Sequence, residues 1–221
     1  MASSKMRIVI ISAVLIATVF LSTAHAQEGN VFAQPGNSRG LFPNSLDIPL
    51  EWKPSREIKA TPDMDLMLLQ RKKIEVKLFN DLRSNQSEIG RNVEKKFTDE
   101  DRLVTTKDNV AEWLTRNFTE VLTDLNVLTT KEQGDAYLTA DIQKFYVKES
   151  GRYSASILLK MQLLSREGEV LWENIILGAS NNWGVFFKKD NYNEGLSNAC
   201  IDAANNLVRN EGFKEGLRKI K

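Results

Sequence analysis

All five prolines of this 221-residue chain lie between residues 35 and 62. Proline fixes φ and has no backbone N–H to donate, so a segment this rich in proline does not form a helix or a central strand. We therefore predict that residues 27–64 form an extended, proline-rich leader. The proline-free remainder, residues 65–221, is long enough to bury a core of its own and is predicted to fold as a single domain.

Apolar side chains are interspersed among these prolines, namely Phe42, Leu46, Ile48, Leu50 and Trp52. Such residues favour contact with other apolar surface, so part of the leader is expected to lie against the domain or against a partner. Disorder of the leader is the alternative that the sequence leaves open.

The N-terminus has the three parts of a secretory signal. Lys5 and Arg7 form a short basic region, residues 8–21 are apolar, and Ala24-His25-Ala26 supplies the small residues of a cleavage site. A membrane-spanning helix needs about 20 apolar residues, so an uncleaved anchor is the less favoured alternative. We predict a signal peptide over residues 1–26, cleavage after Ala26 and a periplasmic or secreted protein. No cysteine stands at the cleavage site to carry a lipid, so no stable membrane anchor is expected.

Cleavage would change the charge and the chemical groups of the chain. The full sequence has 30 basic and 29 acidic residues, and loss of Lys5 and Arg7 would leave 28 basic residues and a net charge of −1. A nearly neutral chain argues against nucleic acid as an electrostatically bound partner. The only histidine, His25, would also be lost, which excludes Ser-His-Asp and Cys-His nucleophile systems and histidine-based zinc sites. We therefore predict no enzyme activity, no metal and no cofactor.

Hydrophobic periodicity predicts the elements of the domain. Alternating apolar residues predict strands at 74–78, 101–107, 136–147, 153–164 and 170–178. Helical spacing predicts helices at 110–125, 192–207 and 212–221. Asn109 and Glu112 have the spacing of a capping box, and Gly168 suits a positive φ in the turn of a hairpin.

Neighbouring strands between two long helices favour an α+β fold. We predict a mostly antiparallel sheet of about four strands with the two long helices on one face, preceded by the extended leader. The other face would be covered by the leader, by a partner or by water.

Asp81 and Arg83 end the first strand, and their spacing of two places both side chains on the same face of a strand. The favoured interpretation is a structural ion pair that stiffens the following loop. A polar strand end that contacts a ligand is the second possibility. Catalysis is the third, because the following residues offer only Glu88 as the second carboxylate that acid–base chemistry would need.

The segment from Phe79 through Asp81 and Arg83 to Ile89-Gly90 resembles the opening of the YajG-like family of bacterial envelope lipoproteins. The order of later segments is similar too: "LTRNFTEVLTDL", the "REGEVLW" hairpin, "ILGASNNWG" and "NEGLSNACIDAANNLV". The resemblance covers roughly residues 70–217, and the layout is also similar to transporter-auxiliary and lipopolysaccharide-assembly lipoproteins. It implies an envelope protein without known catalytic residues. The chain departs from the family because it lacks the lipidated cysteine.

The loop "NNWGVFF" is the main candidate for partner binding. Trp183, Val185, Phe186 and Phe187 flank Gly184 and would form an apolar patch if they were exposed. The alternative is that these side chains fold back over the sheet. Cys200 lies on the apolar stripe of the last long helix and is predicted to be a buried, unreactive thiol.

We thus predict a non-enzymatic, exported envelope accessory protein that binds another envelope component, either a protein or a lipid-like ligand. A binder of a small apolar or lipid-like ligand, held between the helices and the sheet, is the alternative function. A hydrolase based on carboxylates is a distant third. The sequence does not indicate the identity of the partner or the oligomeric state.

Overall fold

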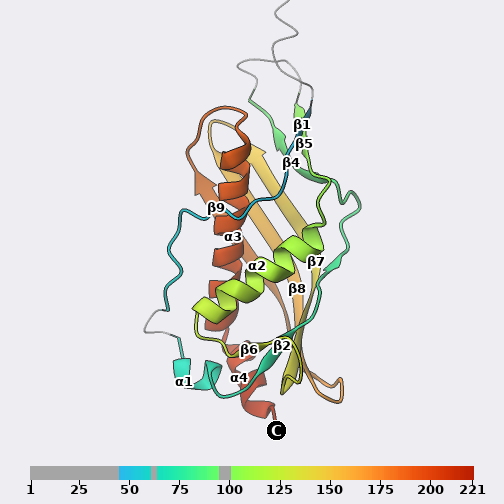
Figure 1. Ribbon diagram of the computed structural model, residues 1–221, viewed down its shortest axis with the longest axis vertical. Helices are drawn as coiled ribbons and strands as arrows, with labels where there is room; N and C mark the ends of the chain where they lie inside the picture. Colours follow the sequence, from blue (N-terminus) through green and yellow to red (C-terminus); the bar gives the residue numbers. More distant parts are fainter. Residues whose placement is uncertain (1–44, 61–63, 95–100) are drawn as a thin grey trace, which may run out of the picture. The chain divides into compact units, whose positions relative to one another are not determined.

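Strand β7 (Ala136–Glu149) is the strand around which the sheet is organised (Figure 1). On one side it pairs with β8 (Tyr153–Ser165), and β8 pairs with β9 (Val170–Asn182), both antiparallel. Gly168 in the turn between β8 and β9 has a φ of 87°, which confirms the predicted turn. Alternate residues of β8 from Ala155 to Leu163 are buried, which confirms the strand predicted here from the alternation of apolar residues.

The computed structural model describes residues 45–60, 64–94 and 101–221. All of them belong to one unit, Arg39–Lys221. The predicted signal peptide, the cleavage site after Ala26 and residues 27–44 of the leader lie outside the described residues.

On its other side, β7 is paired in parallel with three short strands that follow one another along it. They are β2 (Ile74–Val76), β3 (Asn80–Asp81) and β4 (Glu88–Asn92), and their first residues paired with β7 lie opposite Ala136, Asp141 and Val147. The remaining strands extend this side of the sheet: β6 (Thr129–Thr130) beside β2, β5 (Arg102–Thr105) beside β4 and β1 (Ser45–Asp47) beside β5. The chain from 74 to 92 thus runs along β7 as one strand that is interrupted twice.

The predicted fold class, a mostly antiparallel sheet of about four strands with two long helices, is wrong. The described residues form a nine-stranded mixed sheet with four helices. The error arises because parallel pairing depends on contacts between segments that are about 60 residues apart in the sequence. Alternation within one strand does not show which way its neighbour runs.

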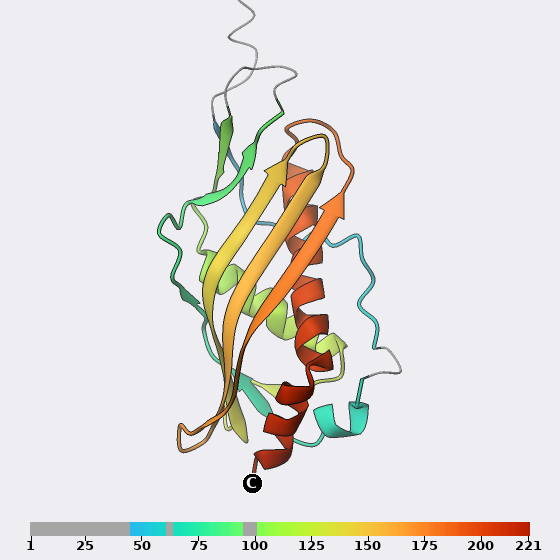
Figure 2. The same cartoon turned by 180° about the vertical axis from the view of Figure 1, so that it is seen from behind.

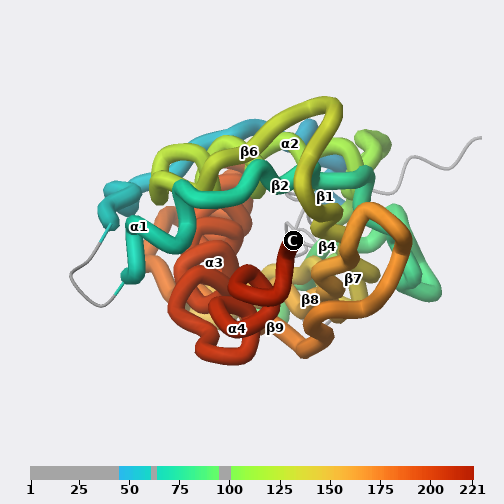
Figure 3. The backbone as a smooth tube through the Cα atoms, turned by 90° about the horizontal axis from the view of Figure 1, so that it is seen from below, coloured from blue at the N-terminus to red at the C-terminus, as the bar shows by residue number. Residues whose placement is uncertain are grey.

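Two long helices, α2 (Val110–Asp124) and α3 (Lys189–Arg209), lie on one face of the sheet (Figure 1), and the view from behind shows the opposite face of β7 to β9 without a helix over it (Figure 2). Asn109 caps α2, since its side chain accepts a hydrogen bond from the N–H of Glu112. The short helices are α1 (Leu66–Leu69) and α4 (Glu211–Lys219). Figure 3 shows α4 beside α3 and β9.

Small residues let α3 pack directly on the edge strand β9. A Cβ at Gly178 would lie 2.0 Å from the carbonyl oxygen of Ala199, so only glycine permits this approach. Polar side chains of α3 then cover the free edge of β9: Asp202 accepts from the N–H of Ala179 at 2.9 Å, and Asn206 donates to the carbonyl of Leu177 at 2.8 Å. The edge is thereby protected from pairing with another chain along this stretch.

Part of the leader is built into the domain. Ile48 and Leu50 lie in the hydrophobic core, and residues 48–58, here called the strap, follow α3. Three buried side chains of α3 bind the backbone of the strap: Asn193, Ser197 and Asn198. For residues 45–60, contact with the domain is therefore the correct one of the two possibilities that the sequence left open.

Candidate functional site

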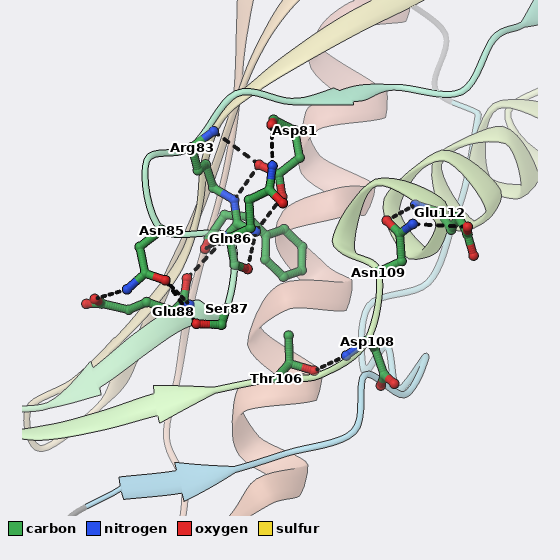
Figure 4. A network of polar contacts seen from close by, with 11 residues as sticks. Asp81, Arg83, Asn85, Gln86, Ser87, Glu88, Thr106, Asp108, Asn109 and Glu112 are labelled. Carbon is green, nitrogen blue, oxygen red and sulfur yellow. Dashed lines mark hydrogen bonds and ion pairs between the residues drawn. The ribbon is translucent and has the colours of Figure 1, made fainter.

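The Asp81–Arg83 pair is a nearly buried, two-point ion pair (Figure 4). Nη2 of Arg83 lies 2.6 Å from Oδ2 of Asp81, and Nε lies 2.9 Å from Oδ1. The side chains are only 7% and 10% exposed. Such a fork-to-carboxylate arrangement fixes the relative orientation of the two groups as well as their distance.

The remaining N–H groups of Arg83 close the loop that follows β3. Nη1 donates to the carbonyls of Glu88 at 2.9 Å and Phe145 at 3.4 Å, and Nη2 also donates to the carbonyl of Gln86 at 2.7 Å. A guanidinium has five N–H donors, and all five are used inside the chain. Arg83 therefore has no donor left for a ligand, and its role in this structure is to hold loop 82–88 on β7.

Glu88, which the sequence offered as the second carboxylate, is held by other partners. Its side chain accepts from Nε of Arg91 at 3.0 Å and from Nδ2 of Asn85 at 3.4 Å. The glycine that follows has a steric role, because a Cβ at Gly90 would lie 2.4 Å from the carbonyl oxygen of Val147. The residues from Asp81 to Gly90 thus serve the pairing of β3 and β4 with β7. Arg83 closes the loop between these two strands, and Gly90 leaves room for the carbonyl of Val147.

A polar cleft of about 260 Å³ lies between this loop and the irregular stretch of β7 at residues 142–144. Besides Arg83 and Phe145, its lining consists of Ser84, Asn85, Glu88, Gln143, Lys144 and Tyr146. Burial, and then the nearby charge of Glu88, raise the pKa of Tyr146 above its ordinary value. The cleft is open, and most of its lining residues have polar or charged side chains, whereas pockets that bind lipid-like ligands are lined mainly by apolar residues.

The second candidate site is the "NNWGVFF" loop, and its four apolar side chains differ in exposure. Trp183 and Val185 are 73% and 69% exposed, whereas Phe186 and Phe187 are partly covered and Phe187 packs against the core. The guanidinium carbon of Arg152, in the turn between β7 and β8, lies 4.3 Å from the ring centre of Trp183. This cation–π contact covers one face of the indole while the side chain remains largely in water.

A buried carboxylate anchors this loop. Glu149, the last residue of β7, is 3% exposed and accepts hydrogen bonds from the N–H of Phe187 at 2.8 Å and from the hydroxyl of Tyr192 at 2.5 Å. The hydroxyl of Tyr153 lies 2.9 Å from the same carboxylate and 2.5 Å from the carbonyl of Val185. The loop is therefore tied to the ends of β7, β8 and α3 together.

The pKa values of Tyr153 and Tyr192 are both raised in this environment. Burial raises the pKa of Tyr153 to about 12. Burial, and then the hydrogen bond to Glu149, also raise the pKa of Tyr192. Both hydroxyls thus remain protonated at neutral pH and act as donors toward Glu149.

The backbone of the loop is held in a conformation that it would rarely adopt alone. Phe187 has a φ of 52°, which costs a non-glycine residue on the order of 1–3 kcal/mol. Gly184 packs against Asn191 so closely that a Cβ would lie 2.3 Å from Nδ2 of that side chain, and Nδ2 also donates to the carbonyl of Val185 at 2.8 Å. The anchor therefore presents Trp183 and Val185 outward on a preorganised loop.

The anchor residues Glu149, Tyr153 and Tyr192 were not predicted as site residues. The signal that could have revealed Glu149 is the alternation of side chains along β7. Phe145, Val147 and Glu149 are each two residues apart and all lie on the buried face of this strand. An acidic residue at the third of these positions indicates a buried carboxylate that needs partners. Cys200 is fully buried, which confirms the predicted burial of this thiol, and burial raises its pKa.

Two further properties concern only the described part of the chain. No helix within residues 45–60, 64–94 and 101–221 is both long and apolar enough to cross a membrane. Within the same residues, no three or more His, Cys, Asp or Glu side chains gather in a way that could hold a metal ion.

Comparison with known proteins gives structural matches only. No protein-family model and no curated protein matches the sequence. A Xanthomonas campestris protein of the DUF330 family matches with 14% identity and a TM-score of 0.51, over 74% of this chain and 92% of its own. An uncharacterised protein matches with 9% identity and a TM-score of 0.43, over 72% and 98% of the two chains. A proposed lipoprotein from Caulobacter crescentus matches with 10% identity and a TM-score of 0.40, over 49% and 83%.

The likeness to the Xanthomonas protein shows a shared fold, because an identity of 14% says nothing beyond the fold. None of these matches is named YajG-like, so that resemblance stays a prediction.

Proposed function

We propose that this chain is a non-enzymatic, exported accessory protein of the bacterial envelope. It binds another envelope component through the loop that carries Trp183, Val185, Phe186 and Phe187, which we call loop 183–188. The observation that carries the proposal is the strong exposure of Trp183 and Val185 on a loop anchored by Glu149. Exposed apolar residues on a preorganised loop suit binding, because little conformational entropy is lost when the partner arrives. The signal-like N-terminus supports the exported location.

The two other candidate sites support their functions, catalysis and the binding of a buried ligand, less well than the loop supports the binding of a partner. Arg83 is fully engaged inside the chain, and Asp81 is bound to it. The alternative function places a lipid-like ligand between the helices and the sheet, where the large side chains of Phe118, Phe145 and Tyr192 are each exposed by 1% or less. A ligand there would have to displace packed core residues, so we place the loop first.

The test is capture of the tagged protein by an envelope fraction. The double variant Trp183→Ala/Val185→Ala is expected to weaken capture about 30-fold or more, which corresponds to the loss of at least 2 kcal/mol typical of hot-spot residues. Its melting temperature should change little, because both side chains lie largely in water.

The matched control is Val170→Ala/Ile175→Ala, which removes two apolar side chains of 52% and 55% exposure from β9, away from the loop. The control should be captured like the wild type. Equal capture of all three proteins would refute a binding role for the loop, and a large fall in the melting temperature of the loop variant would make it a structural lid instead.

A further inference from the structure

Basic residues surround the exposed apolar side chains of loop 183–188. We call the group Trp183, Val185, Arg152, Lys188 and Lys189 the tip. The three cations of the tip are exposed, and Arg152 stacks on Trp183. The segment 181–189 contains two lysines and no acidic residue.

Acidic residues that adjoin the tip, among them Asp190 and Glu94, already have partners inside the chain. Asp190 lies 2.5 Å from Nζ of Lys53 and 3.6 Å from Nζ of Lys188. Glu94 accepts the N–H of Gly151 at 2.5 Å. The positive side of the tip is thus only partly neutralised within the chain, and it is complementary to an anionic surface.

The size of the apolar part argues against a protein as the main partner. A stable protein–protein interface involves about 20–30 residues on each side. The tip offers two strongly exposed apolar side chains and a few cations. Insertion into a lipid headgroup region needs only a small apolar wedge, for which tryptophan is well suited, together with cations that contact anionic headgroups.

The start of the described chain lies at the same end of the sheet as the tip. Strand register places Ser45 in one row with residues of β5, β4, β7 and β8 and, at the far side, with Asn181 of β9. Figures 1 and 2 show β1 and the loop between β9 and α3 at this common end.

We propose that the tip docks the protein onto an anionic lipid surface, with Trp183 and Val185 entering the headgroup region and Arg152, Lys188 and Lys189 contacting phosphates. This inference rests on the proposed function and names the envelope component that the loop binds. It differs from the alternative ligand site between helices and sheet, because the lipid here stays in its membrane.

The test uses the protein purified from cells that express the full-length sequence, mixed with vesicles of phosphatidylglycerol or of phosphatidylcholine. Flotation should show binding to phosphatidylglycerol vesicles more than about tenfold tighter, since each basic residue contributes about fivefold to affinity for an anionic surface. Binding should weaken as salt increases. Tryptophan emission should shift to the blue on binding. Trp183→Phe should abolish the shift, because Trp113 and Trp172 are buried and the partly buried Trp52 packs against the core.

Three variants distinguish the outcomes. Arg152→Gln should reduce the preference for the anionic vesicles, Trp183→Ala/Val185→Ala should abolish binding, and Val170→Ala/Ile175→Ala should bind like the wild type. Absence of vesicle binding by a wild type that the envelope fraction still captures through Trp183 would overturn this inference and leave the proposed function standing, with a protein as partner. Absence of both would overturn both.

Discussion

The backbone N–H of Phe187 donates to the carboxylate of Glu149 over 2.8 Å, across 38 residues of sequence. Together with the contacts of Tyr153 and Asn191 to the carbonyl of Val185, this contact fixes a loop in which Phe187 packs against the core and Trp183 lies largely in water. The strongest predictions concern Glu149 and its partners.

Glu149→Ala should lower the free energy of unfolding by about 2–3 kcal/mol, because it leaves a buried tyrosine hydroxyl and a backbone N–H without their acceptor. Urea denaturation measures this cost. Amide hydrogen exchange should become faster at Phe187 and Lys188, which the anchor holds in place. Glu120→Ala, at an exposed position of α2, is the control and should change stability by less than about 0.5 kcal/mol. Unchanged exchange at Phe187 would show that the loop keeps its shape without the carboxylate.

The raised pKa values of Tyr153 and Tyr192 predict a loss of stability in alkali. Tyrosine in an unfolded chain ionises near pH 10, whereas the folded Tyr153 ionises near pH 12. The unfolded state therefore releases these protons first, so the stabilisation is complete below about pH 10 and is lost as pH rises toward 12. The expected slope is about −1.4 kcal/mol per pH unit for each tyrosine.

Urea midpoints at pH 9, 10 and 11 measure this slope. Tyr192→Phe should make the slope about 1.4 kcal/mol per pH unit less steep, because one tyrosine fewer contributes to it. The variant should also be less stable than the wild type at neutral pH. Val170→Ala, at an exposed apolar position of β9, removes no ionisable group and should leave the slope as it is in the wild type. A flat profile between pH 9 and 11 would contradict the predicted linkage.

Arg83→Lys should lower the free energy of unfolding by about 2–3 kcal/mol, because a lysine ammonium cannot reproduce the five-donor fork. Arg83→Ala should cost about 3–5 kcal/mol, since it leaves Asp81 as a nearly buried charge without its partner. Arg91→Lys is the control, because Arg91 is 44% exposed and its ion pair is worth at most about 1 kcal/mol. If Arg83→Lys kept full stability but lost capture by the envelope fraction, Arg83 would be a ligand contact and its structural role would be rejected.

Asn198→Ala should release part of the strap. The side chain accepts from the N–H groups of Ser55 and Arg56 at 3.1 Å and donates to the hydroxyl of Ser55 at 2.9 Å. We expect a loss of about 1–3 kcal/mol and faster hydrogen exchange at Ser55 and Arg56. Asn205→Ala is the matched control, because that asparagine bonds only to Ile201 of its own helix among the contacts described for it. Equal exchange in the two variants would mean that the strap is held by its apolar residues alone.

The local elements were predictable because their signals lie within a few residues. Helix α2, its Asn109 cap and the hairpin of β8 and β9 follow from spacing and turn chemistry in single segments. The aromatic loop was recognisable as a candidate because four apolar residues beside glycine interrupt a polar sequence. Even so, the exposure of Trp183 and the partial burial of Phe187 could not be separated at that stage.

By itself, therefore, the sequence determined where the long helices α2 and α3 and the β8–β9 hairpin lie, because hydrophobic period, capping and turn residues act over short distances. The tertiary structure alone decided that residues 74–92 run parallel to β7, that the strap binds α3, and that Glu149 meets Phe187 and Tyr192. These contacts join segments that are tens of residues apart, and their partners are selected by the packing of the whole core. The direction in which Trp183 points is a consequence of that packing.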